Sequence, residues 1–121
     1  MKQSYTLKES FKFAINGFYY AARTQKNLRI QLIVAGVVIL ISLFLPMTYL
    51  DWAVLFFLIA SVIVAELFNT AIEKAVDLFI KEYHPTAKTI KDVSAAAVLF
   101  IALISAIVGF IVYVPKILPL L

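Results

Sequence analysis

Cysteine is absent from this chain of 121 residues, which also has only three glycines and one histidine. The missing cysteine excludes disulfides, thiolate nucleophiles and Cys-ligated metal sites, and one histidine cannot form a cluster of His ligands. The glycines are isolated, so neither of the common Gly-rich phosphate-binding loops is present. A nucleotide would have to be held by some other arrangement.

Charged residues are scarce as well, at 15% of the chain, whereas 64% of the residues are hydrophobic. A soluble domain of this length could not keep so much apolar surface out of water, and the composition therefore predicts an integral membrane protein. The first thirty residues are polar and basic and do not form the short apolar core of a signal peptide. We therefore expect the first apolar segment to remain in the mature chain.

Three apolar stretches are each long enough to cross a hydrocarbon layer of about 30 Å. We expect membrane spans over about residues 30–50, 52–68 and 93–118. No helix breaker follows the second span, so its helix should continue as a polar extension to about residue 82. No internal repeat divides the chain, which predicts a single membrane domain over residues 1–121.

The segment before the first span has the pattern of an amphipathic helix over about residues 5–27. Apolar side chains recur there every three or four positions, at Leu7, Phe11, Ile15, Phe18 and Ala22. Such a helix would lie on the membrane surface, with its basic residues facing anionic headgroups. An ordinary helix packed on the bundle is an equally open interpretation, and both can hold.

The distribution of Lys and Arg predicts the orientation in the membrane. Ten of the eleven basic residues lie before the first span or between the second and third, at Lys2, Lys8, Lys12, Arg23, Lys26, Arg29, Lys74, Lys81, Lys88 and Lys91. The positive-inside rule then places the N-terminus and the loop at residues 69–92 in the cytoplasm. The net charge of +4 comes from these membrane flanks, and no RNA- or DNA-binding motif is recognisable.

A polar stripe begins inside the second apolar span and continues beyond it. Its members, at spacings of three, four and four residues, are Glu66, Asn69, Glu73 and Asp77. On an α-helix they stay within a sector of roughly 80° over about 16 Å. An ionisable group at membrane depth costs about 2.5 kcal/mol or more unless it is paired or faces a polar cavity. The stripe is therefore the predicted active site.

The acidic members of the stripe each allow two interpretations. Glu66 could accept the proton of a lipid hydroxyl, or it could be a carboxyl group buried between helices that serves assembly alone. Glu73 and Asp77, about one turn apart, could share one Mg²⁺ with substrate phosphates. Asp77 could instead pair with Lys81 on a solvated helix surface.

The residues before the third span are equally ambiguous. Lys91 could hold a phosphate or serve as a positively charged membrane anchor, and Asp92 could be the N-cap of the following helix. The run from Glu82 to His84, ahead of Pro85, is typical of a helix end followed by a turn. Spacing alone gives these residues no function.

Three segments resemble a known family. They are Ala-Glu-Leu-Phe-Asn-Thr-Ala-Ile-Glu-Lys-Ala-Val-Asp at residues 65–77, Glu-Tyr-His at 82–84 and Lys-Asp-Val-Ser-Ala-Ala-Ala-Val at 91–98. Together they closely resemble the small prokaryotic diacylglycerol kinases, a family that includes the undecaprenol kinases of Gram-positive bacteria. The resemblance implies an all-α homotrimer of chains with a surface helix and three transmembrane helices, with active sites shared between neighbours and MgATP bound at the cytoplasmic face.

The resemblance also implies roles for individual residues. Glu66 would be the general base toward the lipid hydroxyl, Asn69 a nearby polar contact and Glu73 a metal ligand. The nucleotide site would comprise Asp77, Glu82, His84, Lys91 and Asp92. Where the family usually has a glutamate that helps to bind the metal, this chain has Gln25, whose neutral amide oxygen can still coordinate Mg²⁺ but attracts it less.

The leading hypothesis is a lipid kinase of the bacterial cytoplasmic membrane that uses ATP and Mg²⁺ to phosphorylate a long-chain lipid alcohol. The Glu-Lys-Ala-Val-Asp form of the motif and the overall sequence resemble the undecaprenol kinases more than the diacylglycerol kinases of Gram-negative bacteria. This resemblance favours undecaprenol, and diacylglycerol is the alternative substrate. A small oligomeric ion or proton transporter with Glu66 as its ion site is a hypothesis of a different class. A structural assembly protein bound to anionic lipid is a third, but it leaves the cost of Glu66 unexplained.

Overall fold

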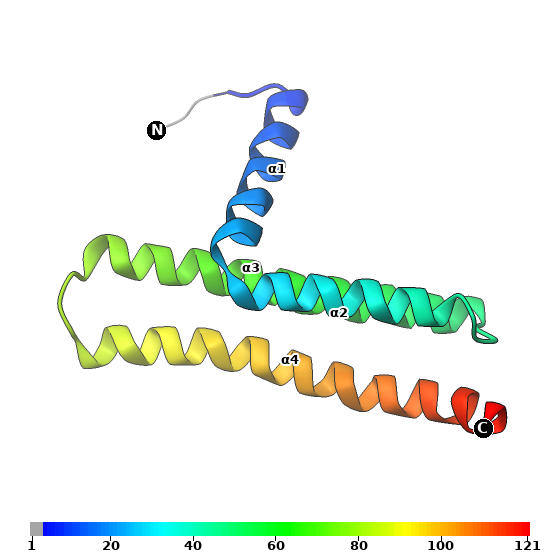
Figure 1. Ribbon diagram of the computed structural model, residues 1–121. Helices are drawn as coiled ribbons and strands as arrows, with labels where there is room; N and C mark the ends of the chain where they lie inside the picture. Colours follow the sequence, from blue (N-terminus) through cyan, green and yellow to red (C-terminus); the bar gives the residue numbers. More distant parts are fainter. Residues whose placement is uncertain (1–3) are drawn as a thin grey trace.

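The computed structural model describes residues 4–121, which are helical almost throughout and contain no strand (Figure 1). Its elements are α1 (Leu7–Thr24), α2 (Lys26–Ser42), α3 (Tyr49–Phe79), α4 (Pro85–Ile117) and the short 3-10 helix η1 (Leu118–Leu120). Lys2, counted above among the basic residues, lies outside the described part of the chain. The prediction of an all-α fold is confirmed for residues 4–121.

The first two helices meet at a sharp bend of 101°. α1 starts with a capping box in which the Thr6 hydroxyl accepts the Glu9 N–H at 3.2 Å and the Glu9 carboxylate accepts the Thr6 N–H at 3.4 Å. It ends at Thr24, a few residues before the expected boundary, and Gln25 links it to α2. The Arg29 guanidinium stabilises the bend by donating to two carbonyl groups at the end of α1, those of Ala22 and Arg23.

α2 is shorter than the predicted first span. It ends at Ser42, so the expectation of a helix to about residue 50 was wrong at that end. Pro46 disfavours a helical conformation at the preceding residue, and Thr48 caps the start of α3. With 17 residues, α2 reaches the length and hydropathy of a span only when the bent pair α1–α2 is taken together.

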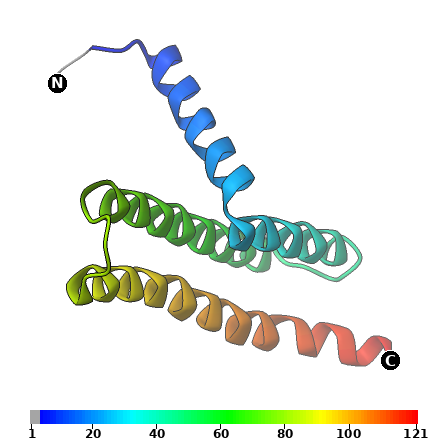
Figure 2. The ribbon, with the colours of Figure 1, turned by 60° about the vertical axis from the view of Figure 1, so that its left-hand side comes forward.

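α3 and α4 are each long and apolar enough to cross a membrane, and they lie side by side in opposite directions (Figure 2). α3 ends at Phe79, slightly before the expected limit of its polar extension. α4 begins at Pro85, well before residue 93, because His84 Nδ1 accepts the Thr86 N–H at 3.1 Å and proline suits a first helical position. Asp92 therefore lies inside α4 and is not its N-cap.

α3 packs against α2 and against α4, while α1 projects away from the other helices (Figure 1). Within residues 4–121 the buried apolar side chains are few, namely Ala21, Leu28, Leu55 and Ala87. Most large apolar side chains are exposed along the helices, which suits contact with lipid or with further chains. The α3–α4 connection and the α2–α3 turn lie at opposite ends of this bundle, and the polar stripe runs toward the α3–α4 connection.

Candidate active site

The polar stripe of α3 passes from a buried end to an exposed end. The Glu66 side chain is enclosed, since the residue is 1% exposed, and Asn69 is 6% exposed. Glu73 is half-buried and Asp77 is exposed. The chain's own helices therefore surround the carboxyl group that would be costly to expose to lipid.

Gln31 of α2 lies against Glu66 and brings a second polar side chain to the buried end of the stripe. The Oε1 atoms of both side chains are nevertheless buried without a hydrogen-bond partner. Buried polar atoms in proteins are normally paired. These two oxygens are therefore available to a ligand that carries a hydroxyl donor.

The sequence prediction missed Gln31. Its only signal was an isolated amide near the start of an apolar run, and nothing in the spacing connects it with a residue on another helix. A lone polar residue within an apolar segment is a sign of function in a membrane protein. That rule would have singled out Gln31 without revealing its partner.

Asn69 and Glu73 form the next part of the stripe. The Asn69 amide nitrogen donates to Glu73 Oε1 at 2.8 Å, which holds that carboxylate in place. The Asn69 Oδ1 atom is buried and has no hydrogen-bond partner. Two oxygen atoms that can bind a metal ion, one from a carboxylate and one from an amide carbonyl, thus lie one turn apart on α3.

At the exposed end of the stripe, Asp77 pairs with Lys91 of α4, with Nζ and Oδ1 2.5 Å apart. The alternative partner, Lys81, instead donates to the backbone carbonyl of Asp77 at 3.0 Å. The hydrogen bond from Lys91 lowers the pKa of Asp77 from its ordinary value, and the positive charges of Lys74 and Lys81 contribute. The pair joins α3 to α4 at the end where Mg²⁺ and phosphate were expected.

This ion pair gives a prediction for pH dependence. Because the pKa of Asp77 is lower in the folded chain than in the unfolded one, the stabilisation is present above the unfolded pKa and is lost as the pH falls through the folded value. Lys91→Met should therefore raise the Asp77 pKa toward its ordinary value and reduce the acid-dependent loss of stability. NMR titration of ¹³C-labelled aspartate carboxyl groups in micelles measures this shift. An Asp77 titration unchanged by Lys91→Met would contradict the pairing.

The other residues predicted for the nucleotide or the metal make no hydrogen bond or ion pair with the stripe within residues 4–121. Asp92 pairs with Lys88 one turn earlier on α4, with Nζ and Oδ2 2.5 Å apart. His84 caps α4 with its side chain, in the connection that follows α3. Glu82 is exposed in the connection between α3 and α4, and Gln25 lies at the α1–α2 bend. Their assignment to a nucleotide or metal site stays a prediction.

The residues of the stripe can be compared with the ligands that Mg²⁺ usually binds. In the described part of the chain, no three His, Asp or Glu side chains come together as a metal-binding group. Mg²⁺, however, usually binds through one or two carboxylates together with waters and substrate phosphates. The Glu73 carboxylate and the unpaired Asn69 oxygen fit that requirement as the protein's share of such a site.

Comparison with known proteins identifies the family of the chain. The family model for prokaryotic diacylglycerol kinase matches residues 12–113. The chain is 37% identical to the undecaprenol kinase of Bacillus subtilis over 108 residues, which cover 89% of this chain and 88% of that protein. It is 39% identical to a diacylglycerol kinase of Synechocystis sp. over 113 residues, which cover 93% of this chain and 65% of that protein. The predicted resemblance is confirmed: the chain belongs to the prokaryotic diacylglycerol kinase family and is a lipid kinase.

Proposed function

We propose that the chain transfers the γ-phosphoryl group of MgATP to the hydroxyl of undecaprenol at the cytoplasmic face of a bacterial membrane. The observation that carries this proposal is the continuous stripe from the buried Glu66 to the exposed Asp77–Lys91 pair. A lipid hydroxyl arrives from the apolar side of the interface and ATP from the aqueous side. The two ends of the stripe suit these two substrates.

Glu66 and Gln31 would act on the lipid hydroxyl. In the transfer, the hydroxyl oxygen forms a bond to the γ-phosphorus, the bond from that phosphorus to the bridging oxygen breaks, and ADP leaves. The hydroxyl proton passes to the Glu66 carboxylate, which acts as general base. Gln31, which lies against Glu66, can contact the same hydroxyl group and so orient its oxygen.

The apolar tail of the substrate also needs a place. An apolar groove of about 590 Å³ runs between α2, α3 and α4 from Gln31 toward Asp51 and Tyr113 at the other end of the bundle. A hydrocarbon tail needs no polar partner, so a groove lined mainly by apolar side chains of the helices suits it. We place the tail in this groove because Gln31, which lines one end of the groove, lies against Glu66, the group that would meet the hydroxyl.

The outer end of the stripe would hold the phosphoryl donor. Lys91 offers an ammonium group to phosphate, and we assign Asp77, Glu82, His84 and Asp92 to the nucleotide site with it. Glu73 and Gln25 would hold Mg²⁺, which when bound offsets negative charge on the phosphate oxygens. Since one chain leaves the outer residues exposed, we propose that neighbouring chains of a homotrimer complete the site.

Gln25→Glu tests the metal assignment. The change restores a negative charge at the α1–α2 bend, so the Mg²⁺ concentration that gives half-maximal transfer should fall by about 10-fold if this side chain binds the metal. A Mg²⁺ titration of ATP-dependent lipid phosphorylation measures it. Asn27→Asp, which adds the same charge on the exposed first turn of α2, is the matched control and should have little effect. Equal shifts in the two variants would show a general charge effect and reject Gln25 as a ligand.

The choice of lipid is tested by competition. Relatives of this chain carry the names undecaprenol kinase and diacylglycerol kinase, and the undecaprenol kinase of Bacillus subtilis matches it over most of both lengths. In mixed micelles that contain both lipids, we expect kcat/KM to be higher for undecaprenol. A higher kcat/KM for diacylglycerol would overturn the undecaprenol assignment and keep the lipid kinase.

A further inference from the structure

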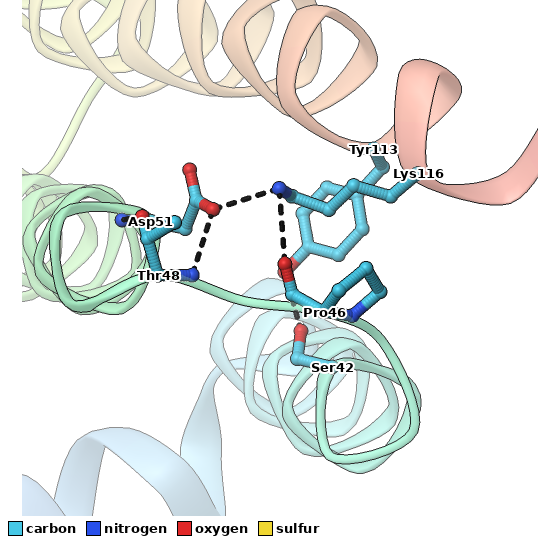
Figure 3. A network of polar contacts seen from close by, with 6 residues as sticks. All are labelled: Ser42, Pro46, Thr48, Asp51, Tyr113 and Lys116. Carbon is cyan, nitrogen blue, oxygen red and sulfur yellow. Dashed lines mark hydrogen bonds and ion pairs between the residues drawn. The ribbon is translucent and has the colours of Figure 1, made fainter.

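A second group of polar side chains lies at the end of the bundle away from the α3–α4 connection (Figure 3). Lys116, near the end of α4, places its Nζ atom 2.8 Å from Asp51 Oδ2 of α3 and donates to the Pro46 carbonyl at 3.3 Å. Tyr113, one turn earlier on α4, hydrogen-bonds through its hydroxyl to that of Ser42 on α2. We call Ser42, Asp51, Tyr113 and Lys116 the clasp. No step of the proposed phosphoryl transfer uses the clasp, although Asp51 and Tyr113 also line the far end of the apolar groove.

The clasp is more enclosed than the other ion pairs of residues 4–121. The Lys116 and Asp51 side chains are 17% and 19% exposed, whereas those of the pairs Lys88–Asp92 and Lys91–Asp77 range from 38% to 62%. Ser42 is fully buried. Exposed ion pairs contribute little and are screened by salt, but enclosed pairs are screened much less. The clasp is therefore suited to fix a geometry.

Asp51, whose carboxylate pairs with Lys116, is itself held in place by hydrogen bonds. Asp51 Oδ2 also accepts the Thr48 N–H at 3.0 Å, and the Thr48 hydroxyl accepts the Asp51 N–H at 3.1 Å. This capping box fixes the carboxylate to the first turn of α3. Lys116 thus connects the last turn of α4 to a defined point on α3, and Tyr113 connects it to α2.

Between its two ends, α4 has no comparable contact. The hydroxyl groups of Ser94 and Ser105, which lie in that stretch, are buried without hydrogen-bond partners. In the described chain, the polar side-chain contacts from α4 to other helices are Lys91–Asp77 at one end and the clasp at the other. Apolar packing is non-directional and specifies the sliding and rotation of a helix weakly. The polar contacts at the two ends of α4 therefore restrict its sliding and rotation in addition to the packing between them.

We propose that the clasp sets the register and rotation of α4 and thereby holds Lys91 opposite Asp77 at the far end of the same helix. Lys116 and Tyr113 are then positioning residues for the phosphate-binding end, about 37 Å away along the axis. A slip of one residue would move Lys91 by about 1.5 Å and turn it by about 100°. This inference rests on the proposed function only for its kinetic consequence.

Four variants separate the charge of the clasp from its bulk. Lys116→Met removes the ammonium group and keeps an unbranched chain, and Lys116→Arg keeps the charge. Asp51→Asn removes the negative charge but leaves an oxygen to accept the Thr48 N–H. Tyr113→Phe removes only the hydroxyl. Lys12→Met, an exposed lysine on α1 outside both the clasp and the stripe, is the matched control.

The position of α4 can be measured without turnover. Because the chain has no cysteine, Leu78→Cys on α3 and Val93→Cys on α4, both exposed, give two defined sites for spin labels. With labelled chains diluted in unlabelled ones, pulsed electron resonance reports the distance within one chain. We expect Lys116→Met to broaden or shift the distribution, and we expect Lys116→Arg and Lys12→Met to match the unaltered chain. An unchanged distribution in Lys116→Met would overturn the proposal.

The kinetic readout then distinguishes positioning from general stability. Lys116→Met should raise KM for MgATP on the order of 10-fold, because a displacement of about 1 Å is enough for a large loss. KM for the lipid can change as well, because Asp51 and Tyr113 line the groove assigned to the lipid tail. Lys116→Arg should restore the MgATP value. Lys116→Met combined with Asp51→Asn should be no worse than either change alone, since both remove one interaction. A shifted distance distribution with an unchanged KM for MgATP would reject the positioning role.

Two further outcomes remain decisive. If Lys116→Met does not give a helical protein by circular dichroism, Tyr113→Phe carries the test, with a smaller change expected in the same direction and no change overturning the proposal. If the unaltered chain phosphorylates no lipid, the kinase proposal fails. The distance measurement, made without ATP, still decides whether the clasp holds α4.

Discussion

Glu66→Gln is expected to lower kcat for lipid phosphorylation by about 10²–10⁴-fold, the usual contribution of a general base. The amide has nearly the same shape as the carboxyl group, so the helices should stay packed. KM for MgATP should change little, because Glu66 lies at the buried end of the stripe, away from Lys91. Steady-state transfer of labelled γ-phosphate in mixed micelles, with the thermal unfolding midpoint measured in parallel, gives both quantities.

The alternative role of Glu66, in assembly alone, makes the opposite forecast. If the Glu66 carboxyl group only joins helices, Glu66→Gln should lower the stability of the protein, while turnover by the folded fraction should stay normal. Glu9→Gln on α1 is the matched control, since the amide oxygen can still accept the Thr6 N–H that Glu9 accepts. Normal kcat in folded Glu66→Gln would reject Glu66 as the base.

The second large effect is expected from Glu73→Gln. The change removes the charge that attracts Mg²⁺ and keeps an oxygen that can accept the hydrogen bond from Asn69. The Mg²⁺ concentration for half-maximal transfer should rise by roughly 10- to 100-fold, as is common when groups at a metal site are altered. A Mg²⁺ titration at fixed ATP measures the shift. Part of the lost turnover should return at high Mg²⁺.

Removal of the metal provides the corresponding control. Chelation by EDTA should stop transfer by the unaltered chain, and excess Mg²⁺ should restore it fully. Combining Glu73→Gln with Gln25→Glu returns one negative charge to the proposed donor set, so it should recover part of the Mg²⁺ affinity. Identical Mg²⁺ titrations for Glu73→Gln and the unaltered chain would exclude Glu73 as a ligand.

The helices of this fold were predictable because the apolar runs are long, but several of their ends were not. Hydropathy marks the part of a helix that lies in hydrocarbon, whereas helices end where backbone groups find caps. α4 starts at Pro85 because His84 caps it, although the apolar residues begin later. α2 ends at Ser42 although the chain stays apolar beyond it, because Pro46 disfavours a helical conformation at the residue before it and Thr48 caps the start of α3.

The stripe was predictable because its four members lie on one helix, where periodicity alone determines which side chains share a face. The contacts between different helices could not be predicted in this way. Gln31 of α2 lies against Glu66, and the Asp77 carboxylate pairs with Lys91 of α4 and not with Lys81, one turn away on the same helix. The clasp joins Asp51 to Lys116 across much of the chain. No spacing rule relates such residues, because their proximity depends on how the helices pack.

The most direct test of the central claim places the purified chain in vesicles that contain undecaprenol, with labelled MgATP outside and a pH-sensitive dye inside. The account predicts labelled undecaprenyl phosphate that depends on ATP and on Glu66, and no proton flux when ATP is absent. Unlabelled lipid together with ATP-independent flux that Glu66→Gln abolishes would contradict it and would make the stripe an ion pathway.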